Sequence, residues 1–401
     1  MSVLVTAPRA RTARGAGRAA SRARSTPGIA GVPARRSSYL FLVAIVAVLC
    51  LAGLVMVLSA SSVASLANLG TPWWYFDHQG VYMCIGGIAF FAAQGIRISF
   101  WQLIARPLMF VSVAALGAVL VAGRSAGGAS RWLGSGSFQF QPSELAKFAL
   151  ILFAADVLAR REGKRGWRYR AGPVVVVMAI FVALILKQPD MGTAVVVCCI
   201  GGAVLFTAGM PFAPMLASGA ISAFAGFVYA GSASYRAARI TSFIHPFAYA
   251  RTSGYQSVQA LIALGNGHWS GAGLGQSLAS WGYLPNQYTD FIFAVIGQET
   301  GFAGSVVVVG LFAAIGVVGT RVAWRAASTF ESLVAAGITA WLVSQAIINI
   351  GAVAGVLPVT GVPLPFVSYG GTSLIIVMFA AGLLANVARR CSPGSAAALA
   401  G

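Results

Sequence analysis

The chain has 401 residues, of which 58% are hydrophobic and only 9% charged, and its formal net charge is +19. So few polar residues cannot cover a soluble body of this size, which excludes an ordinary soluble enzyme and favours a chain embedded in lipid. Neither the five cysteines nor the three histidines show the spacing of a metal centre or a nucleophile–histidine pair.

Residues 1–37 form the first predicted element, a tail with eight arginines and no acidic residue. Such a composition cannot bury enough apolar surface to offset its ordering entropy, so we predict a disordered cytoplasmic tail. A basic arm could bind nucleic acid, but we favour an orientation signal lying against anionic headgroups and expect no nucleic-acid partner.

Apolar runs of the length that crosses a hydrocarbon core of about 30 Å recur from Tyr39 onward. They predict an all-α integral membrane protein of about ten transmembrane helices within residues 38–390, followed by a short cytoplasmic tail, 391–401. The predicted spans are 38–60, 79–95, 107–122, 143–160, 172–187, 190–209, 213–230, 290–318, 331–351 and 372–388.

The basic residues predict how these helices are oriented. With a cytoplasmic N-terminus, five segments lie on the inner side and hold 20 of the 27 basic residues, as the positive-inside rule requires. These segments are 1–37, 96–106, 160–170, 319–330 and the residues after Asn386. Both termini are then cytoplasmic, and a long extracytoplasmic loop, 231–289, joins helices 7 and 8. Its periodic apolar residues predict short interfacial helices. Residues 358–373 contain three prolines and must satisfy their backbone through water or neighbouring protein.

Asp290 is the one acidic residue between Asp190 and Glu299, and it lies where the eighth predicted span begins. The carboxylate either interacts with the helix dipole, which is worth up to about 1 kcal/mol, or serves as a base. It would act singly, because nine residues at 100° each place Glu299 on the opposite helix face.

Lys147 lies about one turn inside an apolar span, three residues after Glu144. Intramembrane ionisable groups usually face the bundle interior and serve function, although these two could form a purely structural pair. Arg131 could bring a guanidinium suited to phosphate oxygens to the same vestibule. Lys187 and Asp190 mark a helix corner for which structural and functional roles both stay open.

Arg236 and Arg239 are cations on the predicted outer side, against the orientation rule. They suggest an anionic ligand such as a pyrophosphate lipid head, and a solvated loop face is an equal alternative. The glycines of 265–277 follow no predicted strand, so they do not form a dinucleotide-binding fingerprint.

A series of motifs, in order along nearly the whole chain, resembles the SEDS family, which includes FtsW, RodA and SpoVE. MVLSASS favours FtsW, the septal branch, over RodA, the elongation branch. The motifs are GLVMVLSASS (53–62), ASRWLG (129–134), QPSELAK (141–147), KQPDMGT (187–193), WGYLPNQYTDFIFAVIGQE (281–299) and LPVTGVPLPFVSYGGTS (357–373).

The resemblance implies a peptidoglycan glycosyltransferase that polymerises lipid II at the outer face of the bacterial cytoplasmic membrane and releases undecaprenyl pyrophosphate. Asp290 matches the family's essential aspartate, as general base or as ligand of a divalent cation, Mg²⁺ or Mn²⁺, with no organic cofactor expected. The predicted substrate-binding residues are Arg131, Gln141, Glu144, Lys147, Lys187, Asp190, Arg236, Arg239 and Ser368.

The implied partners are the growing glycan strand, a class B penicillin-binding protein transpeptidase and other divisome proteins at the septum. A lipid II flippase and a non-catalytic scaffold for the transpeptidase stay as alternative functions. Relatives commonly carry a glutamate and a histidine before the Thr-Asp pair and a second glutamate after it, where this chain has Asn286, Tyr288 and Gln298. These departures leave a supporting metal or proton relay in doubt.

Overall fold

The computed structural model describes residues 34–126, 129–135, 138–163, 166–211, 213 and 241–391. Within these residues the strands are β1 (Arg124–Ala126), β2 (Ala129–Ser135) and β3 (Phe138–Phe140), and two short 3₁₀ helices are η1 (Pro246–Tyr249) and η2 (Leu278–Trp281). The α-helices are α1 (Ala34–Leu69), α2 (Trp74–Gly95), α3 (Ile98–Ala122), α4 (Pro142–Arg160), α5 (Trp167–Lys187), α6 (Met191–Thr207), α9 (Tyr255–Asn266), α10 (Ile292–Trp324), α11 (Thr329–Val353) and α12 (Gly371–Arg390).

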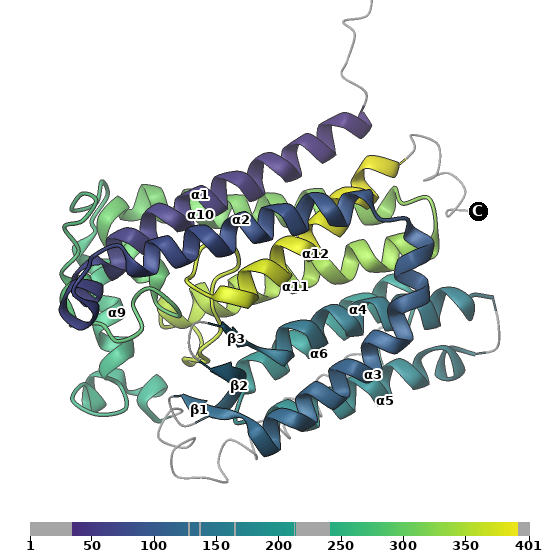
Figure 1. Ribbon diagram of the computed structural model, residues 1–401, viewed down its shortest axis with the longest axis horizontal. Helices are drawn as coiled ribbons and strands as arrows, with labels where there is room; N and C mark the ends of the chain where they lie inside the picture. The colour runs from purple at the N-terminus through teal and green to yellow at the C-terminus, as the bar shows by residue number, and fades with distance from the viewer. Residues whose placement is uncertain are drawn as a thin grey trace, which may run out of the picture.

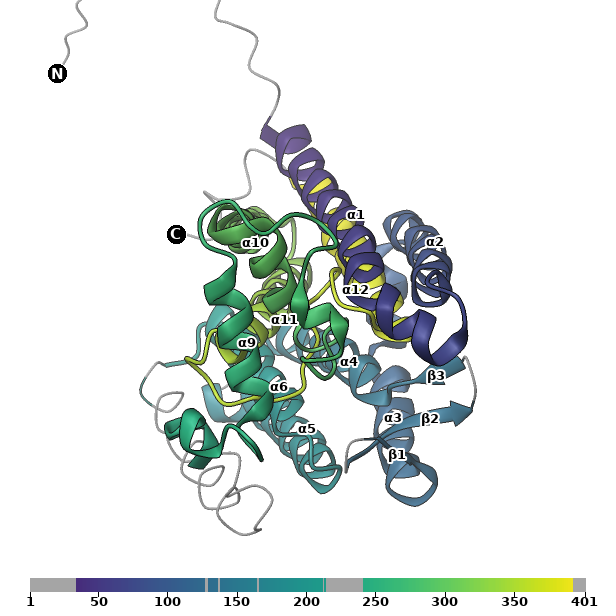
Figure 2. The ribbon, with the colours of Figure 1, turned by 90° about the vertical axis from the view of Figure 1, so that its left-hand side faces the viewer.

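The long helices run side by side along the longest axis of the molecule, and successive helices point in opposite directions from α1 to α6 and again from α10 to α12 (Figure 1). One end of the bundle, here called the α9 end, carries α9, the three strands and the connection 354–370 (Figures 1 and 2). The opposite end, here called the arginine end, carries Arg97, Arg160, Arg321 and Arg389 at helix termini. The connections predicted to be cytoplasmic therefore meet at one end of the bundle.

Helix positions confirm the predicted all-α multi-pass membrane fold. Nine of the ten predicted spans coincide with described helices, and the tenth, 213–230, falls almost entirely outside the described residues. Six described helices are long and apolar enough to cross a membrane, namely α1, α3, α5, α10, α11 and α12. The predicted tail up to residue 33, Arg236 and Arg239 also lie outside the described residues, and α1 begins at Ala34, inside the predicted tail.

Burial separates inner helices from outer ones. Nearly every side chain of α4 is buried, and α11 and α12 are buried over most of their length. Outer helices expose large apolar residues instead, among them Phe41, Leu103 and Val176. Such residues have no favourable contact with water, so this outward apolar surface fits contact with lipid tails.

A small antiparallel sheet, which the sequence did not predict, follows α3. Strands β1, β2 and β3 pair in that order, with Leu133 opposite Phe140 and Gly134 opposite Gln139. These strands have three to seven residues and lie in a Gly- and Ser-rich stretch, so they show no clear alternation of polar and apolar residues. The hydroxyl of Thr372 donates to the Gln139 carbonyl at 2.9 Å, which ties the sheet to the start of α12.

Helix α10 is interrupted at Gly301, whose φ of 69° and ψ of −167° are not helical. The chain before α10 docks at this break, since Phe302 N donates to the His268 carbonyl at 2.9 Å. A Cβ at Gly301 would lie 2.4 Å from Gly271 N, so only glycine allows the two segments to approach so closely.

Candidate functional site

A cavity of about 900 Å³ opens at the α9 end of the bundle. Its walls come from the start of α2, strands β2 and β3, residues 252–256, residues 285–290 and residues 359–373. Three predicted site residues line it, namely Arg131, Gln141 and Asp290. Segments far apart in the sequence thus meet around one space, as expected of a ligand site.

Asp290 lies in the turn just before α10, which begins at Ile292 and has Phe291 as its N-cap. The predicted span began at residue 290, so the structure moves this carboxylate out of the helix and into the cavity wall. Glu299 does not line the cavity, and its Oε1 accepts a hydrogen bond from Ser59 Oγ at 2.5 Å. The two acids are therefore not a catalytic pair.

The backbone leading into Asp290 is held by three successive hydrogen bonds. Tyr369 N donates to the Tyr288 carbonyl at 2.9 Å, and Ser368 Oγ donates to the Thr289 carbonyl at 2.6 Å. Asn349 Nδ2 then donates to the Asp290 carbonyl at 2.7 Å. Since α11 and the connection before α12 supply all three donors, they fix the position of Asp290 in the cavity.

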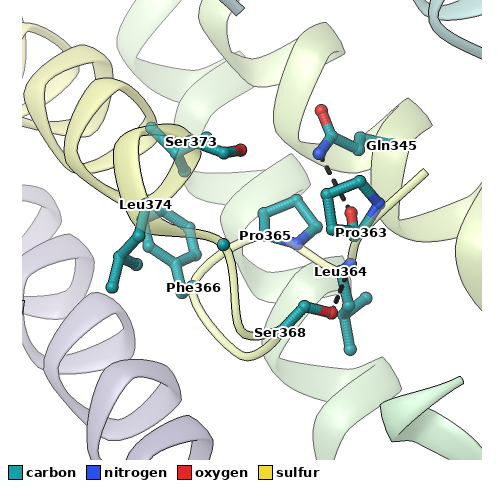
Figure 3. Close-up of a pocket in the computed structure, with 10 residues that line it drawn as sticks. Gln345, Pro363, Leu364, Pro365, Phe366, Ser368, Ser373 and Leu374 are labelled. Carbon is teal, nitrogen blue, oxygen red and sulfur yellow. Dashed lines mark hydrogen bonds between the residues drawn. The ribbon is translucent and has the colours of Figure 1, made fainter. Parts of the chain in front are cut away.

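The proline-rich connection that provides two of these donors is itself held by hydrogen bonds. Gln345 Nε2 donates to the Pro363 carbonyl at 3.0 Å, and Leu364 N donates to Ser368 Oγ at 2.8 Å (Figure 3). Asn349 Nδ2 also reaches the Val362 carbonyl at 2.7 Å. Of the two predicted alternatives, water or neighbouring protein, it is neighbouring protein that satisfies the Val362 and Pro363 carbonyls. Ser368 is 4% exposed and borders a small space beneath the connection, not the large cavity.

Arg131 approaches Asp290 from strand β2. Its Nη2 donates to the Pro189 carbonyl at 3.0 Å, and its Nε lies 3.6 Å from Asp190 Oδ2. A Cβ built at Gly361 would lie 3.2 Å from Arg131 Nη1 and 3.5 Å from Asp290 Oδ2. The guanidinium and the carboxylate therefore border the same space in front of Gly361.

Lys147 and Glu144 form a buried pair behind the connection, with Nζ 2.7 Å from Glu144 Oε1 and both side chains 1% exposed. Lys147 Nζ also donates to Gln345 Oε1 at 2.8 Å and lies 4.9 Å from the Trp341 ring centre. Neither member of the pair lines the large cavity. Lys147 consequently reaches the site through Gln345, which holds the Pro363 carbonyl, and not by direct contact with a ligand in the cavity.

Asp190 caps helix α6, where its Oδ1 accepts from Thr193 N at 3.2 Å and its Oδ2 accepts from Thr193 Oγ1 at 2.9 Å. The same carboxylate lies 3.6 Å from Arg131 Nε, so Asp190 both caps a helix and orients a residue of the cavity wall. Lys187 is exposed at the end of α5 and does not line the cavity. Gln141 is the N-cap of α4 and does line it.

A family model described as "Cell cycle protein", FtsW/RodA/SpoVE, matches residues 39–392. The chain belongs to this family. Membership confirms the resemblance inferred from the motifs, and it extends over all the elements that build the cavity.

Two curated relatives of the family are similar over most of the chain. The probable peptidoglycan glycosyltransferase FtsW of Mycobacterium tuberculosis is 38% identical over 366 residues, which is 90% of this chain and 70% of the relative. The stage V sporulation protein E of Bacillus subtilis is 38% identical over 361 residues, 88% of this chain and 98% of the relative.

Solved structures of the family share the fold. A chain from work on the structural coordination of polymerization and crosslinking by a peptidoglycan synthase complex has a TM-score of 0.73 at 29% identity, covering 88% of this chain and 98% of that one. The crystal structure of the Thermus thermophilus rod shape determining protein RodA has a TM-score of 0.65 at 30% identity, covering 87% and 96%.

A divalent cation at Asp290 would need further ligands from the cavity wall. Among the described residues, no group of three histidine, cysteine, aspartate or glutamate side chains could hold a metal ion. Asp290 is the one carboxylate that the described part of the chain contributes to the cavity wall, and Arg131 lies beside it. A cation next to a guanidinium is disfavoured electrostatically, so these residues alone do not fit a metal.

Two groups of site residues have no signal in the sequence that sets them apart. Asn349 lies in the middle of an apolar span, and its contacts with Asp290 and Val362 join residues distant in the chain. Tyr75 and Tyr369 line the cavity together with Tyr288. Of these three tyrosines, the sequence singled out only Tyr288, because it stands where relatives commonly carry histidine.

Proposed function

We propose that this family member is a peptidoglycan glycosyltransferase that polymerises glycan strands from lipid II, with Asp290 as general base. The observation that carries the proposal is a carboxylate and a guanidinium bordering one space inside a cavity of about 900 Å³. The relatives named as probable peptidoglycan glycosyltransferases support the reaction class.

The reaction assigns separate tasks to the two groups. Asp290 accepts the proton of an acceptor sugar hydroxyl as its oxygen forms a bond to the anomeric carbon of the lipid-linked sugar. The bond from that carbon to the pyrophosphate oxygen breaks, the lipid pyrophosphate leaves with the electron pair, and the anomeric configuration inverts. Arg131 stabilises the charge that develops on the leaving group, because guanidinium groups form strong charge-assisted hydrogen bonds with phosphate oxygens.

The backbone contacts support this division of roles, since a base is effective only when it is held in hydrogen-bonding reach of the proton it accepts. Asn349, Ser368 and the Tyr369 amide hold the carbonyls beside Asp290. Asp190 holds Arg131 from the other side. The site therefore needs little reorganisation at the moment of reaction.

Orientation forms a second part of the proposal. We infer that the arginine end is cytoplasmic, by the positive-inside rule, so that the cavity opens at the outer face. A cysteine at Arg168 should then resist a membrane-impermeant maleimide in intact cells, and one at Ser253 should react. The chain without either substitution supplies the background from its own cysteines, and labelling at Arg168 from outside would reverse the orientation.

The partner is proposed to be a class B penicillin-binding protein transpeptidase at the division septum. Support comes from the similar chain solved in a peptidoglycan synthase complex and from the relatives named FtsW. A strand polymerised at the outer face would pass directly to a crosslinking enzyme there.

Purified protein, with and without such a transpeptidase, tests the function directly. Incubation with lipid II should release undecaprenyl pyrophosphate and yield glycan strands of inverted anomeric linkage, measured by gel electrophoresis and NMR. Translocation of lipid II across proteoliposomes without polymer would favour the flippase. Neither activity, combined with tight transpeptidase binding, would favour the scaffold.

A further inference from the structure

Three tyrosines from separate segments converge on one wall of the cavity, here called the tyrosine cluster. Tyr75 lies in the first turn of α2, Tyr288 precedes α10 and Tyr369 precedes α12. The ring centres of Tyr75 and Tyr288 are 4.5 Å apart, and Tyr369 lies 5.2 Å from Tyr75 and 5.9 Å from Tyr288, nearly perpendicular to both. All three rings line the cavity, and each is only half-buried.

A purely structural cluster would bury its rings in the core, as Trp101 and Phe148 do elsewhere in the bundle. The tyrosine cluster differs because it keeps accessible ring surface and places hydroxyl groups beside it. Tyr288 Oη donates to Tyr75 Oη at 3.1 Å. The cluster is thus apolar on its faces and polar at its edges.

Two phenols of the tyrosine cluster, Tyr288 and Tyr369, are uncharged at physiological pH. Burial, and then the hydrogen bond with Tyr75, raises the pKa of the Tyr288 phenol well above its usual range. Burial likewise raises the pKa of Tyr369. Both phenols stay protonated, so they offer neutral rings and hydroxyl donors and do not compete with Asp290 for protons.

We propose that the tyrosine cluster is a carbohydrate subsite, which stacks on the pyranose ring of an N-acetylhexosamine beside the reacting centre. A pyranose ring has an apolar face of C–H groups, which matches the negative face of an aromatic ring, and a rim of hydroxyls, which matches phenolic hydroxyls. The Arg131 and Asp290 side of the cavity suits the charged pyrophosphate and the proton to be moved. This inference rests on the proposed function and assigns the neutral wall to the sugar.

The contact between the cluster and the catalytic turn favours this placement. Tyr288 lies two residues before Asp290, and the Tyr369 amide bonds the Tyr288 carbonyl at 2.9 Å. The backbone segment that carries Asp290 would therefore also position a sugar ring stacked on these tyrosines. Ring position and proton transfer are set by one rigid segment.

Leucine and phenylalanine substitutions separate stacking from hydroxyl contacts and from packing. Tyr288→Leu and Tyr369→Leu should each raise KM for lipid II by about five- to ten-fold, with kcat within about two-fold. Tyr288→Phe and Tyr369→Phe should stay within about three-fold of wild type, because the ring remains. Tyr283→Leu is the matched control, since Tyr283 is 58% exposed and lies outside the cavity wall.

A binding measurement makes the subsite testable independently of turnover. A soluble oligosaccharide of alternating N-acetylglucosamine and N-acetylmuramic acid should show saturation-transfer NMR signals with the detergent-solubilised wild type and with the phenylalanine variants. The leucine variants should lose most of that signal at unchanged thermal stability. If wild type binds the oligosaccharide in this pattern but makes no polymer from lipid II, the proposed function fails and the subsite stands. Leucine variants that bind the oligosaccharide as wild type does, or that lose kcat without a change in KM, would overturn the subsite.

Discussion

The two ends of the bundle each place an aspartate near arginine, but in different surroundings. At the arginine end, Asp156 is 2% exposed and binds Arg106 at 3.2 Å and Arg160 at 2.5 Å, both of which have side chains more than half exposed. At the α9 end, Asp290 and Arg131 border a shared space inside a cavity. The first arrangement neutralises a buried charge with solvated cations, whereas the second directs opposite charges at a space large enough for a ligand.

This difference shows that a buried aspartate in a membrane protein is not by itself a sign of chemistry. Both carboxylate oxygens of Asp156 accept hydrogen bonds from arginines of α3 and α4, so they are already occupied and are poorly placed to bind a ligand. The Asp290 backbone carbonyl instead accepts a hydrogen bond from Asn349, and Asp290 lines a cavity. Changes at the two ends should consequently separate activity from stability.

The largest effect is expected from Asp290→Asn. The substitution keeps the size of the side chain and the backbone contacts but removes the basic oxygen, so polymerisation should fall by at least about 100-fold. Membrane insertion and thermal stability should stay near wild type. Lipid II polymerisation by purified protein measures the rate, and a variant within a few-fold of wild type would reduce Asp290 to a charge near a helix start.

Arg131→Ala should come next, with a loss of about 10- to 100-fold in kcat/KM, because one charge-assisted contact with phosphate is worth about 1.5–3 kcal/mol. Arg131→Lys should recover only part of the loss, since an ammonium cannot keep the forked geometry that reaches Pro189 and Gly361. Arg168→Ala, an exposed cation at the arginine end, serves as the control. Equal kinetics for Arg131→Ala and this control would contradict phosphate recognition.

Asn349→Asp tests the brace on Asp290 by an isosteric change, because a carboxylate cannot donate to the Asp290 and Val362 carbonyls. We expect kcat to fall by about ten-fold with little change in KM, as a misplaced base slows chemistry more than binding. Asn349→Ala should behave similarly. An unchanged kcat in both variants, measured with lipid II, would show that other contacts suffice to hold the turn.

Lys147→Met should act on stability, because Lys147 is buried in a pair with Glu144 and does not line the large cavity. Removing the buried ammonium leaves Glu144 uncompensated, a loss of about 3–5 kcal/mol, while KM for lipid II should change less than about three-fold. The pair Lys147→Met with Glu144→Gln should restore much of the thermal stability. A large rise in KM at normal stability would instead return Lys147 to direct recognition.

Asp156→Asn should have the smallest effect on activity, within about two-fold. Its arginine partners are more than half exposed and can be solvated when the charge is lost, so the stability cost should be about 1 kcal/mol. Thermal unfolding and polymerisation, measured on the same preparation, test both statements. A strong loss of polymerisation would break the contrast between the two ends.

Local patterns along the chain were sufficient to predict the helices but only part of the site. The apolar runs and arginine clusters predicted the bundle, and helix-start residues such as Asp190 were recognisable from Pro189 and the turn they form. The sheet was missed because its short strands lack alternation. Contacts such as Asn349 with Asp290 and Lys147 with Gln345 join residues 59 and 198 positions apart, and no local pattern records such a distance.

Helix length determines the level at which a lipid-linked substrate would meet this site. The part of α10 after Gly301 is about 35 Å long at 1.5 Å per residue, already enough to cross a hydrocarbon core of about 30 Å. The turns before Gly301 and the segment docked against them would then extend beyond the hydrocarbon core at the α9 end. A substrate whose tail stays in the bilayer would reach the cavity by lateral diffusion, at a constant height and with its polar head always facing the same way. The search for the site is thereby reduced from three dimensions to two.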